Sequence, residues 1–463
     1  MRPPPPALPG LPLLGNLLEY RREHVEVFRR GYRTLGPVFS MRLGPQRAAV
    51  MVGPEHHRFF FTQADRALSL PEVYRFVVPM FGEVLNASPH AEVRRGQLAL
   101  LHTAFRGARM DGYVAAMAAE TRAWIASLGA SGTFELNEAF TTLGMRIAAA
   151  ALVGPEVRAR IEELRPLYED LARGMEFVLP PNLPLPRFRR RDRARKKLEE
   201  MVAPLLAARR AAPGAHDDFL EKLATEGDEA ALGMALLAVF TGYITTSAQA
   251  AWTLVQLLES PRWEAAVREE TAEVLGHRPH SVDAPALARL SRLEWALKES
   301  QRMNPVMSHY ARYVAQDIEA GGYRIPRGWL AMVCPAVAHR LPQYFAEPDT
   351  YDPGRFAPDR AEDRATPYAL IPFGGGPYRC PGMAFGTHEM KCIVGMLLQH
   401  FDMELLDRAP GRDFEMGVIR PRPPCRVRYT RRAAAPHEAR AVPAGAVAAP
   451  EGWPPTDTHR RVR

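Results

Sequence analysis

Apolar residues recur at spacings of three and four along most of this chain, which predicts a protein built mainly from helices. Two alternating runs near the N-terminus predict instead a β-hairpin that turns at Gly44-Pro45. Further strand-like runs follow residue 401. The predicted helices cover residues 98–105, 114–128, 138–152, 157–171, 229–258, 293–303 and 383–398, and the predicted strands cover 38–43, 48–52, 309–314 and 321–332. The expected fold class is mainly α with small β-sheets.

Changes in composition mark both ends of the helical region. Residues 1–20 are rich in proline, which predicts a stiff N-terminal arm. Residues 431–463 combine Ala, Pro and Arg without an apolar period, which predicts a disordered tail. Residues 21–430 are expected to form one helix-rich domain, in which the basic run 187–195 is most simply a solvated helix start.

The predicted helix over residues 229–258 is nearly continuous in apolar residues, so we expect it to pass through the core. Its middle reads Phe-Thr-Gly-Tyr-Ile-Thr-Thr-Ser, and Gly242 there costs about 1 kcal/mol relative to alanine. Buried hydroxyls can bond to the carbonyl four residues earlier, which favours a kinked core helix. The functional interpretation is a place where the helix admits O2 and water against a flat cofactor.

A glycine-rich segment, residues 372–382, is suited to holding Cys380 toward a metal. Three consecutive glycines permit backbone angles and close approaches that a Cβ forbids. Pro381 is expected at the first helical position, which would place Cys380 at a helix N-terminus, where the dipole favours a thiolate. A soft thiolate is the proximal ligand with which haem iron cleaves O–O bonds. The alternative is a glycine-rich turn before a helix, with a buried free cysteine.

The composition is that of an ordinary globular protein, with 47% hydrophobic and 24% charged residues in 463. Four scattered cysteines without Cys-x-x-Cys spacing indicate a reducing compartment and disfavour a structural zinc site. We expect no membrane-spanning run and find no signal pattern, so a cytoplasmic protein is expected. The net charge of +8 favours acidic partners. Nucleic acid is not expected, because the basic residues do not form one stripe.

The glycine-rich segment resembles the haem-binding loop of cytochrome P-450, whose pattern is Phe-x-x-Gly-x-(Arg/His)-x-Cys-x-Gly. Phe373, Gly376, Cys380 and Gly382 match this pattern. Tyr378 stands where the family usually has a basic residue for a haem propionate, and its phenol offers a hydrogen bond without a charge. The resemblance implies haem as the cofactor and Cys380 as the iron ligand. The other residues that it implies near the haem are Phe373, Gly374, Tyr378, Arg312 and Tyr74.

The middle of the long helix resembles the oxygen-activating helix of the same family, whose pattern is Ala/Gly-Gly-x-Asp/Glu-Thr-Thr/Ser. Gly242, Thr245 and Thr246 match, whereas Thr241 occupies the first position and Ile244 the position of the acid. The resemblance implies that Thr245, with Thr246, organises protons for O–O cleavage. Isoleucine cannot relay protons, so delivery would rest on these hydroxyls and ordered water.

Two later segments resemble the family's scaffold and follow in its order. Glu299 and Arg302 match the Glu-x-x-Arg helix, and Arg355 lies in a segment similar to the loop that supplies the third partner. The resemblance implies a buried ion-pair scaffold behind the haem, and guanidinium forks on a carboxylate suit such a site. Without it, the pair would be a surface contact worth only about 0.5 kcal/mol. Arg312 falls where the family places a propionate-binding arginine.

Residues 74–83 are aromatic-rich and have no clear period, which by itself favours a loop packed on the core. The segment resembles the substrate-facing loop of sterol 14α-demethylases, a branch of the same family. The implied substrate-pocket residues are Tyr74, Phe76, Val77, Phe81, Thr241 and Ile244.

Taken together, the resemblance covers residues 2–429 and implies the cytochrome P-450 fold, in which one helix-rich domain with small sheets encloses a haem. The implied activity is insertion of one O2 atom into a bulky hydrophobic substrate, sterol-like or terpenoid. Electrons would come from NAD(P)H through a reductase and an acidic ferredoxin or flavodoxin, and we expect a monomer. Three alternatives remain open: a sterol 14α-demethylase proper, a peroxide-using or isomerising haem-thiolate enzyme, and a non-catalytic haem-binding protein.

Overall fold

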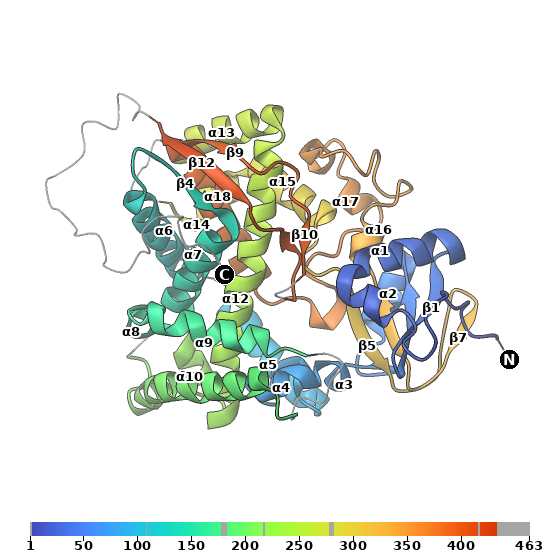
Figure 1. Cartoon of the computed structure of the whole chain (residues 1–463). Coiled ribbons are helices and arrows are strands. Elements are labelled where there is room, and N and C mark those ends of the chain that lie inside the picture. The colour runs from blue at the N-terminus through green and yellow to red at the C-terminus, as the bar shows by residue number, and fades with distance from the viewer. Residues whose placement is uncertain are drawn as a thin grey trace, which may run out of the picture.

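Helices make up most of the protein, and its strands gather into small sheets (Figure 1). The computed structural model describes residues 2–107, 109–176, 183–215, 218–276, 282–414 and 417–432. The mainly α class expected from the apolar spacing is confirmed. The longer helices are α1 (Leu17–Leu35), α2 (Pro54–Thr62), α5 (Ala91–Ala104), α6 (Arg109–Ser127), α7 (Leu136–Ala148), α9 (Ile161–Arg173), α10 (Pro186–Ala211), α12 (Asp228–Leu258), α13 (Pro261–Leu275), α15 (Ser291–Met303) and α18 (Met383–His400).

Short helical turns connect these elements, and some of them differ from the prediction. The predicted helix over 157–171 is divided, because Arg160 has non-helical backbone angles. The segment 74–83, expected as a loop, forms three successive turns, two of which begin at or next to a proline that pre-sets the helical φ. The short helices are α3 (Pro71–Tyr74), η1 (Arg75–Val77), α4 (Val78–Phe81), η2 (Leu85–Ala87), η3 (Ala149–Val153), α8 (Pro155–Arg158), α11 (Phe219–Leu223), α14 (Ala284–Arg289), α16 (Pro335–Ala338), η4 (Pro353–Phe356), α17 (Glu362–Ala365) and η5 (Gly376–Tyr378).

The largest sheet joins three strands from the first 70 residues to two strands between residues 310 and 333, with the strand order β1-β2-β8-β5-β3. The predicted hairpin is its edge: β1 pairs antiparallel with β2, and Gly44 takes a φ of +64° in the turn between them. β2 then pairs parallel with β8, so that Ala48 lies opposite Leu330. The five strands are β1 (Val38–Leu43), β2 (Gln46–Met51), β3 (Leu68–Ser69), β5 (Tyr310–Val314) and β8 (Leu330–Val333).

The remaining strands form three smaller sheets. β12 lies between β4 and β9, so the chain after residue 401 packs beside a strand near residue 131 (Figure 1). The short strands expected over 321–332 are β7 and β8, which lie in different sheets on either side of the turn at residues 326–328. These strands are β4 (Ser131–Glu135), β6 (Ile318–Ala320), β7 (Tyr323–Ile325), β9 (Phe401–Leu405), β10 (Arg412–Asp413), β11 (Arg420–Pro421) and β12 (Arg426–Arg431).

Helix α12 runs through the middle of the molecule, where it contacts α7, α10, α15 and α18 (Figure 1). Its length and apolar composition would be enough to cross a membrane, so the expectation that no run is long enough was wrong. Most of that apolar window, 61%, is buried inside the protein, as suits a helix that other helices surround.

The N-terminal arm lies along the first strand, where the N–H of Leu8 donates to the carbonyl of Ser40. At the other end, Arg431 is the last residue of β12. Residues 433–463, most of the predicted tail, lie outside the described residues, and the expected domain limits stay predictions.

Candidate functional site

The Cys380 loop joins η5 to α18. Helix α18 begins at Met383 with Gly382 as its N-cap. The expectation that Pro381 occupies the first helical position was therefore wrong, because Pro381 and Gly382 form a turn ahead of the helix. The N–H of Cys380 donates to the carbonyl of Phe373 at 3.0 Å, and this hydrogen bond joins the two ends of the glycine-rich loop.

The Cys380 thiol is enclosed by protein and yet accessible. Burial raises its pKa, while the N–H of Gly382 and the charge of Arg379 lower it. The residue nevertheless keeps solvent-accessible surface, whereas the other three cysteines are buried. The thiol thus has protein groups close to it although the residue is not closed off from solvent. Cys380 is therefore the cysteine available to a bound group.

Glycine is required in this loop because the loop lies directly against α2. Gly374 and Gly376 have φ values of +70° and +64°. A Cβ on Gly375 would lie 2.8 Å from the Tyr368 ring, and one on Gly376 would lie 2.8 Å from the carbonyl oxygen of Phe61. The glycines therefore allow the backbone to pass close to the Phe61 and Tyr368 rings just before Cys380.

Three threonines of α12 are predicted site residues: Thr245 and Thr246 for proton delivery and Thr241 for the substrate pocket. Thr241 is exposed and Thr245 is partly exposed, although the helix passes through the core, so these residues border accessible space. Thr245 Oγ1 donates to the carbonyl of Thr241 at 2.9 Å, and Thr246 Oγ1 donates to that of Gly242 at 2.5 Å. Thr246 and Ile244 are buried. The helix is continuous through these residues.

Arg312 is the buried member of a polar cluster that also includes the partly buried Tyr74. Arg312 Nη1 donates to the carbonyl of Phe60 at 2.5 Å, and the guanidinium lies 4.5 Å from the centre of the Phe60 ring. Burial lowers the pKa of Arg312 to about 10, while Tyr74, Asp65 and Tyr378 oppose this shift. Burial also raises the pKa of Tyr74. A buried guanidinium beside phenols is suited to receive a carboxylate.

Tyr378 contacts two residues that the sequence analysis missed. Its hydroxyl donates to the Asp65 carboxylate, and Arg94 Nε donates to the same hydroxyl at 3.3 Å. Arg94 also forms an ion pair with Asp65 and is buried. Asp65 has a φ of +60°, an uncommon angle for a residue with a Cβ. Tyr378 and Asp65 are 313 residues apart, so the only local signal would have been an acidic residue in a turn just before a strand.

The predicted pocket residues divide into two groups. The rings of Tyr74 and Phe76 stack with centroids 6.1 Å apart, and Phe76 and Val77 are only partly buried. Phe81 has no exposed surface and packs against Phe240 of α12 at 5.3 Å. The structure thus places Tyr74, Phe76 and Val77 where surface remains and Phe81 in the core.

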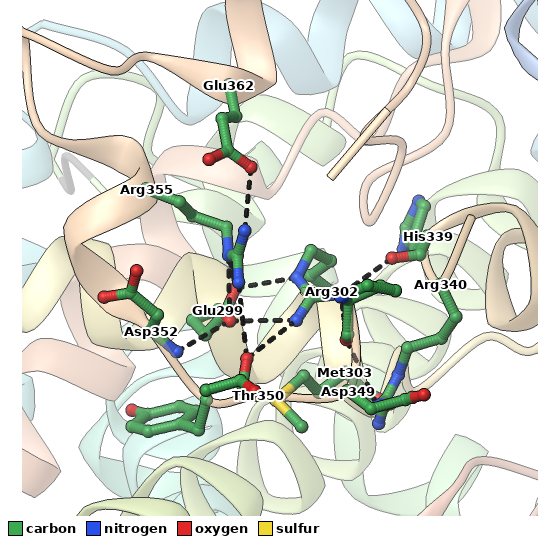
Figure 2. Close-up of polar contacts among 12 residues, drawn as sticks. Glu299, Arg302, Met303, His339, Arg340, Asp349, Thr350, Asp352, Arg355 and Glu362 are labelled. Carbon is green, nitrogen blue, oxygen red and sulfur yellow. Dashed lines mark hydrogen bonds and ion pairs between the residues drawn. The ribbon is translucent and has the colours of Figure 1, made fainter. Parts of the chain in front are cut away.

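The predicted scaffold residues meet in the core, where Figure 2 shows Glu299 between Arg302 and Arg355. All three side chains are almost wholly buried. Arg302 also donates to the carbonyl oxygens of His339 and Pro348 at 2.8 and 2.7 Å. The ion pair therefore ties α15 to the segments around α16 and η4, and is not the surface pair that spacing alone allowed.

Residues 3–429 match the model of the family described as Cytochrome P450. The chain belongs to this family, and it is a monooxygenase of the oxidoreductase class with haem as its cofactor. The fold expected from the resemblance is confirmed by the match to a solved structure of the family.

Two relatives and that solved structure are similar over nearly the whole chain. Obtusifoliol 14-alpha demethylase of Triticum aestivum is 33% identical over 448 residues, which cover 93% of this chain and 98% of that protein. Sterol 14alpha-demethylase of Mycobacterium tuberculosis strain H37Rv is 32% identical over 90% of this chain and 96% of its own length. Retinoic acid-bound cyanobacterial CYP120A1 superposes with a TM-score of 0.85 at 25% identity, covering 93% of this chain and 100% of that one.

The described residues fit a haem group. Cys380 offers one accessible sulfur, and glycines beside it leave room where a Cβ would collide. Arg312 and Tyr74 offer donors for carboxylates, whereas the Tyr378 hydroxyl already donates to Asp65. When bound, haem supplies O2 activation at a thiolate-ligated iron. Burial raises the pKa of the Tyr310 phenol, and the nearby Cys380 raises it further. The same phenol donates to the carbonyl of Pro372 at 3.1 Å.

Proposed function

We propose that this enzyme inserts one oxygen atom of O2 into a bulky hydrophobic substrate of the sterol or terpenoid type. The accessible Cys380 carries this proposal, because it is the cysteine that is not buried and so can offer a soft thiolate ligand to a bound group. The relatives named above act on sterols, and the solved structure holds retinoic acid, so similar chains are associated with large apolar molecules.

The residues around this space have distinct proposed roles. The stacked Tyr74 and Phe76, with Val77, offer an apolar wall for a flat or polycyclic substrate. Thr241 and Thr245 lie on the same face of α12. Each Oγ1 donates to a backbone carbonyl and keeps its lone pairs, with which it orients water. Arg312 holds a carboxylate at the cofactor's edge, while Tyr378 joins Asp65 to Arg94. Glu299, Arg302 and Arg355 keep the supporting loops fixed.

Two electrons for each turnover would come from NAD(P)H through a reductase and an acidic ferredoxin or flavodoxin. The net charge of +8 supports an acidic partner, because opposite charges steer encounter. The reduction rate should then fall as ionic strength rises, since screening shortens the range of this attraction to about 10 Å at 0.1 M salt. A reduction rate that does not change between low and high salt would contradict this docking mode.

The experiment that tests the substrate class combines binding with product analysis. Purified haem-loaded protein is titrated with sterols, terpenoids and small aromatic compounds, and substrate-induced changes of spin state are recorded. Turnover is then measured with NADPH, ferredoxin and reductase. We expect spin-state changes and oxygenated products with sterols or terpenoids only. Products from hydrogen peroxide but none from the electron-transfer chain would favour a peroxide-using enzyme instead.

A second candidate function is sterol 14α-demethylation itself. The similarity to several proteins named as 14-demethylases favours it. Ile244 counts against it, because sterol 14α-demethylases have a histidine at the corresponding position. Incubation with a 14α-methyl sterol decides between the two: loss of the methyl group supports demethylation, and hydroxylation elsewhere supports a different sterol or terpenoid oxidation.

A further inference from the structure

An aromatic groove lies on the surface between α13, α15 and the segment that leads into η4. Its volume is about 660 Å³, and its lining includes Trp263 of α13, Trp295 of α15 and Tyr351. Sites that bind a ligand commonly have volumes of about 300 to 1,000 Å³. Neither the motifs nor the proposed function gives this groove a role.

The three aromatic side chains of the groove are held in place but are not fully buried. A Cβ on Gly354 would lie 3.2 Å from the Trp263 ring, so this ring packs directly against the backbone of η4. The Tyr351 hydroxyl donates to the carbonyl of Ala296 at 3.4 Å. Within the described residues, the indole N–H groups of Trp263 and Trp295 have no hydrogen-bond partner. Fixed rings with free N–H donors suit a proline-rich segment, whose rings pack on indoles and whose carbonyls accept hydrogen bonds.

The chain itself contains a segment of matching composition after residue 432. Residues 453–455 read Trp-Pro-Pro, and Glu451 precedes the tryptophan by two positions. Proline favours the extended polyproline conformation before binding, which lowers the entropy lost on docking. The proline run at the N-terminus lies elsewhere, because the N–H of Ser40 in β1 donates to the carbonyl of Pro6 at 2.7 Å. Residues 451–455 thus combine an acid, an aromatic ring and two prolines within five positions.

The described chain ends beside the helix that forms one wall of the groove. Asp402 of β9 pairs with Arg432 at 3.1 Å and with Arg268 of α13 at 3.7 Å, so these two arginines share one carboxylate (Figure 1). Trp263 precedes Arg268 by five positions, which is about 8 Å along a helix. Trp453 follows Arg432 by 21 positions, and a flexible chain of that length spans about 25 Å on average. Residues 451–455 can therefore reach the groove of their own chain.

One cation at the groove is placed to meet Glu451. Arg262 is exposed, and its guanidinium lies 5.7 Å from the centre of the Trp263 ring. It has no ion pair within the part of the chain that the structure describes, whereas Arg360, the other arginine of the lining, already binds Asp352 at 2.5 Å. Two residues span about 6 Å in a polyproline helix. An acid two positions before a docked tryptophan therefore falls close to a cation beside the groove.

We propose that the aromatic groove binds residues 451–455 of the same chain, with the two proline rings against the indoles and Glu451 beside Arg262. The tether presents this segment to the groove at a concentration on the order of 1 mM, so even weak contacts keep the groove occupied. The docking does not depend on the substrate or on the proposed reaction.

Docking at this groove supports the buried ion-pair scaffold from outside. Asp352 lines the groove, and its N–H donates to Glu299 Oε1 at 2.9 Å, as Figure 2 shows. Arg355 follows in the same segment and binds the same carboxylate. A segment bound in the groove therefore restrains residues 350–360, which carry one side of the scaffold.

Hydrogen–deuterium exchange on the haem-loaded full chain tests the docking. We expect backbone amides of residues 350–360 to exchange about tenfold faster in Trp453→Ala than in wild type, because the bound segment no longer restrains them. Pro443→Ala is the matched control, since Pro443 follows residue 432 in the same part of the chain but has no tryptophan beside it. This control should leave the rates unchanged. Equal rates in wild type and Trp453→Ala overturn the proposal.

An exchange of charges tests the contact between Glu451 and Arg262. Arg262→Glu should speed exchange over residues 350–360, because two acids then face each other. The double variant Arg262→Glu with Glu451→Arg should slow it again, because the pair forms with its signs reversed. Such a rescue separates a direct contact from a local effect of the Arg262→Glu change on α13. A double variant that exchanges as fast as Arg262→Glu overturns the proposed pairing.

A labelled peptide with the sequence of residues 448–458 tests which chain occupies the groove. It should bind Trp453→Ala, and it should bind wild type about tenfold more weakly, because the tethered segment competes with it. Exchange rates of wild type should not change with protein concentration. Rates that slow as the concentration rises would show that the segment enters a second copy, which contradicts docking within one chain. A peptide that binds neither protein excludes the groove as a site for this segment.

Discussion

Arg302 binds Glu299 through two hydrogen bonds between side chains that are both wholly buried: Nε lies 2.7 Å from Oε2, and Nη2 lies 2.9 Å from Oε1. Arg355 Nε contacts the same two oxygens at 3.0 and 3.1 Å. One carboxylate therefore compensates two buried guanidinium groups. Its removal should be far more costly than the loss of a surface ion pair.

We expect Glu299→Gln to lower the free energy of unfolding by about 3–5 kcal/mol, because it leaves the buried Arg302 without an anion and Arg355 with Glu362 alone. Chemical denaturation of the purified protein, followed by circular dichroism, measures this loss. Asp349→Asn is the control: Asp349 is 88% exposed in its pair with Arg340, and such a pair contributes at most about 1 kcal/mol. Equal losses in the two variants would contradict the scaffold role.

Cys380→Ser should abolish thiolate ligation, because a neutral hydroxyl is a poor donor to iron. The measurement is the absorption spectrum of the reduced carbon monoxide complex, which should lose the band typical of thiolate-ligated haem. Cys392→Ser serves as the control, since Cys392 is buried in the same segment of chain but lies inside α18. A spectrum unchanged by Cys380→Ser would show that another group ligates the iron.

Thr245→Val should lower product formed for each NADPH consumed by about 100-fold, because Thr245 is the hydroxyl of α12 that both borders accessible space and occupies the motif position. Product and hydrogen peroxide are measured together. Thr253→Val is the matched control, for Thr253 makes the same bond to the carbonyl four residues earlier, at 2.8 Å, but is fully buried. Parallel losses in both variants would point to helix stability and away from proton delivery.

Acid should destabilise the fold through His57. Burial lowers the pKa of this histidine from 6.5 to about 4 in the folded protein. The unfolded chain binds the proton below pH 6.5 and the folded protein only below about 4, so the free energy of unfolding falls as pH drops through this window, by about 3 kcal/mol in all. Denaturation at a series of pH values should show a smaller slope for His57→Asn, in which an amide can replace the donor to Tyr368. An unchanged slope would exclude His57 as a source of acid lability.

The pattern of nearby residues was sufficient to predict those helices and turns that are determined by residues close in sequence. The hairpin at Gly44 and the helix over 229–258 agree with the structure to within a few residues, because apolar spacing and turn residues act locally. The position of Cys380 in a glycine loop before a helix was also readable, although the start of that helix was misplaced by two residues. Backbone preferences at Pro381 do not show whether the helix begins at that proline or after it.

Contacts between distant segments could not be predicted. Nothing near Tyr378 indicates that its hydroxyl meets Asp65, or that Arg94 joins them, because these residues are brought together only by tertiary packing. Glu389, which is fully buried in α18, shows in the sequence only as a charge within an apolar helix. Lys391, two residues later, gives the same signal but bonds to Glu294 at 2.7 Å, so the pattern alone cannot tell a paired charge from an unpaired one.

The parallel pairing of β2 with β8 has a consequence for how the chain is made. Val50 aligns with Met332, so the sheet that contains the first hairpin stays incomplete until residues beyond 330 have left the ribosome. Such distant pairing slows folding, since a long loop must close before the contact is made. A nascent or truncated chain that stops before β8 therefore carries an unpaired strand edge, the kind of surface that chaperones must shield from aggregation.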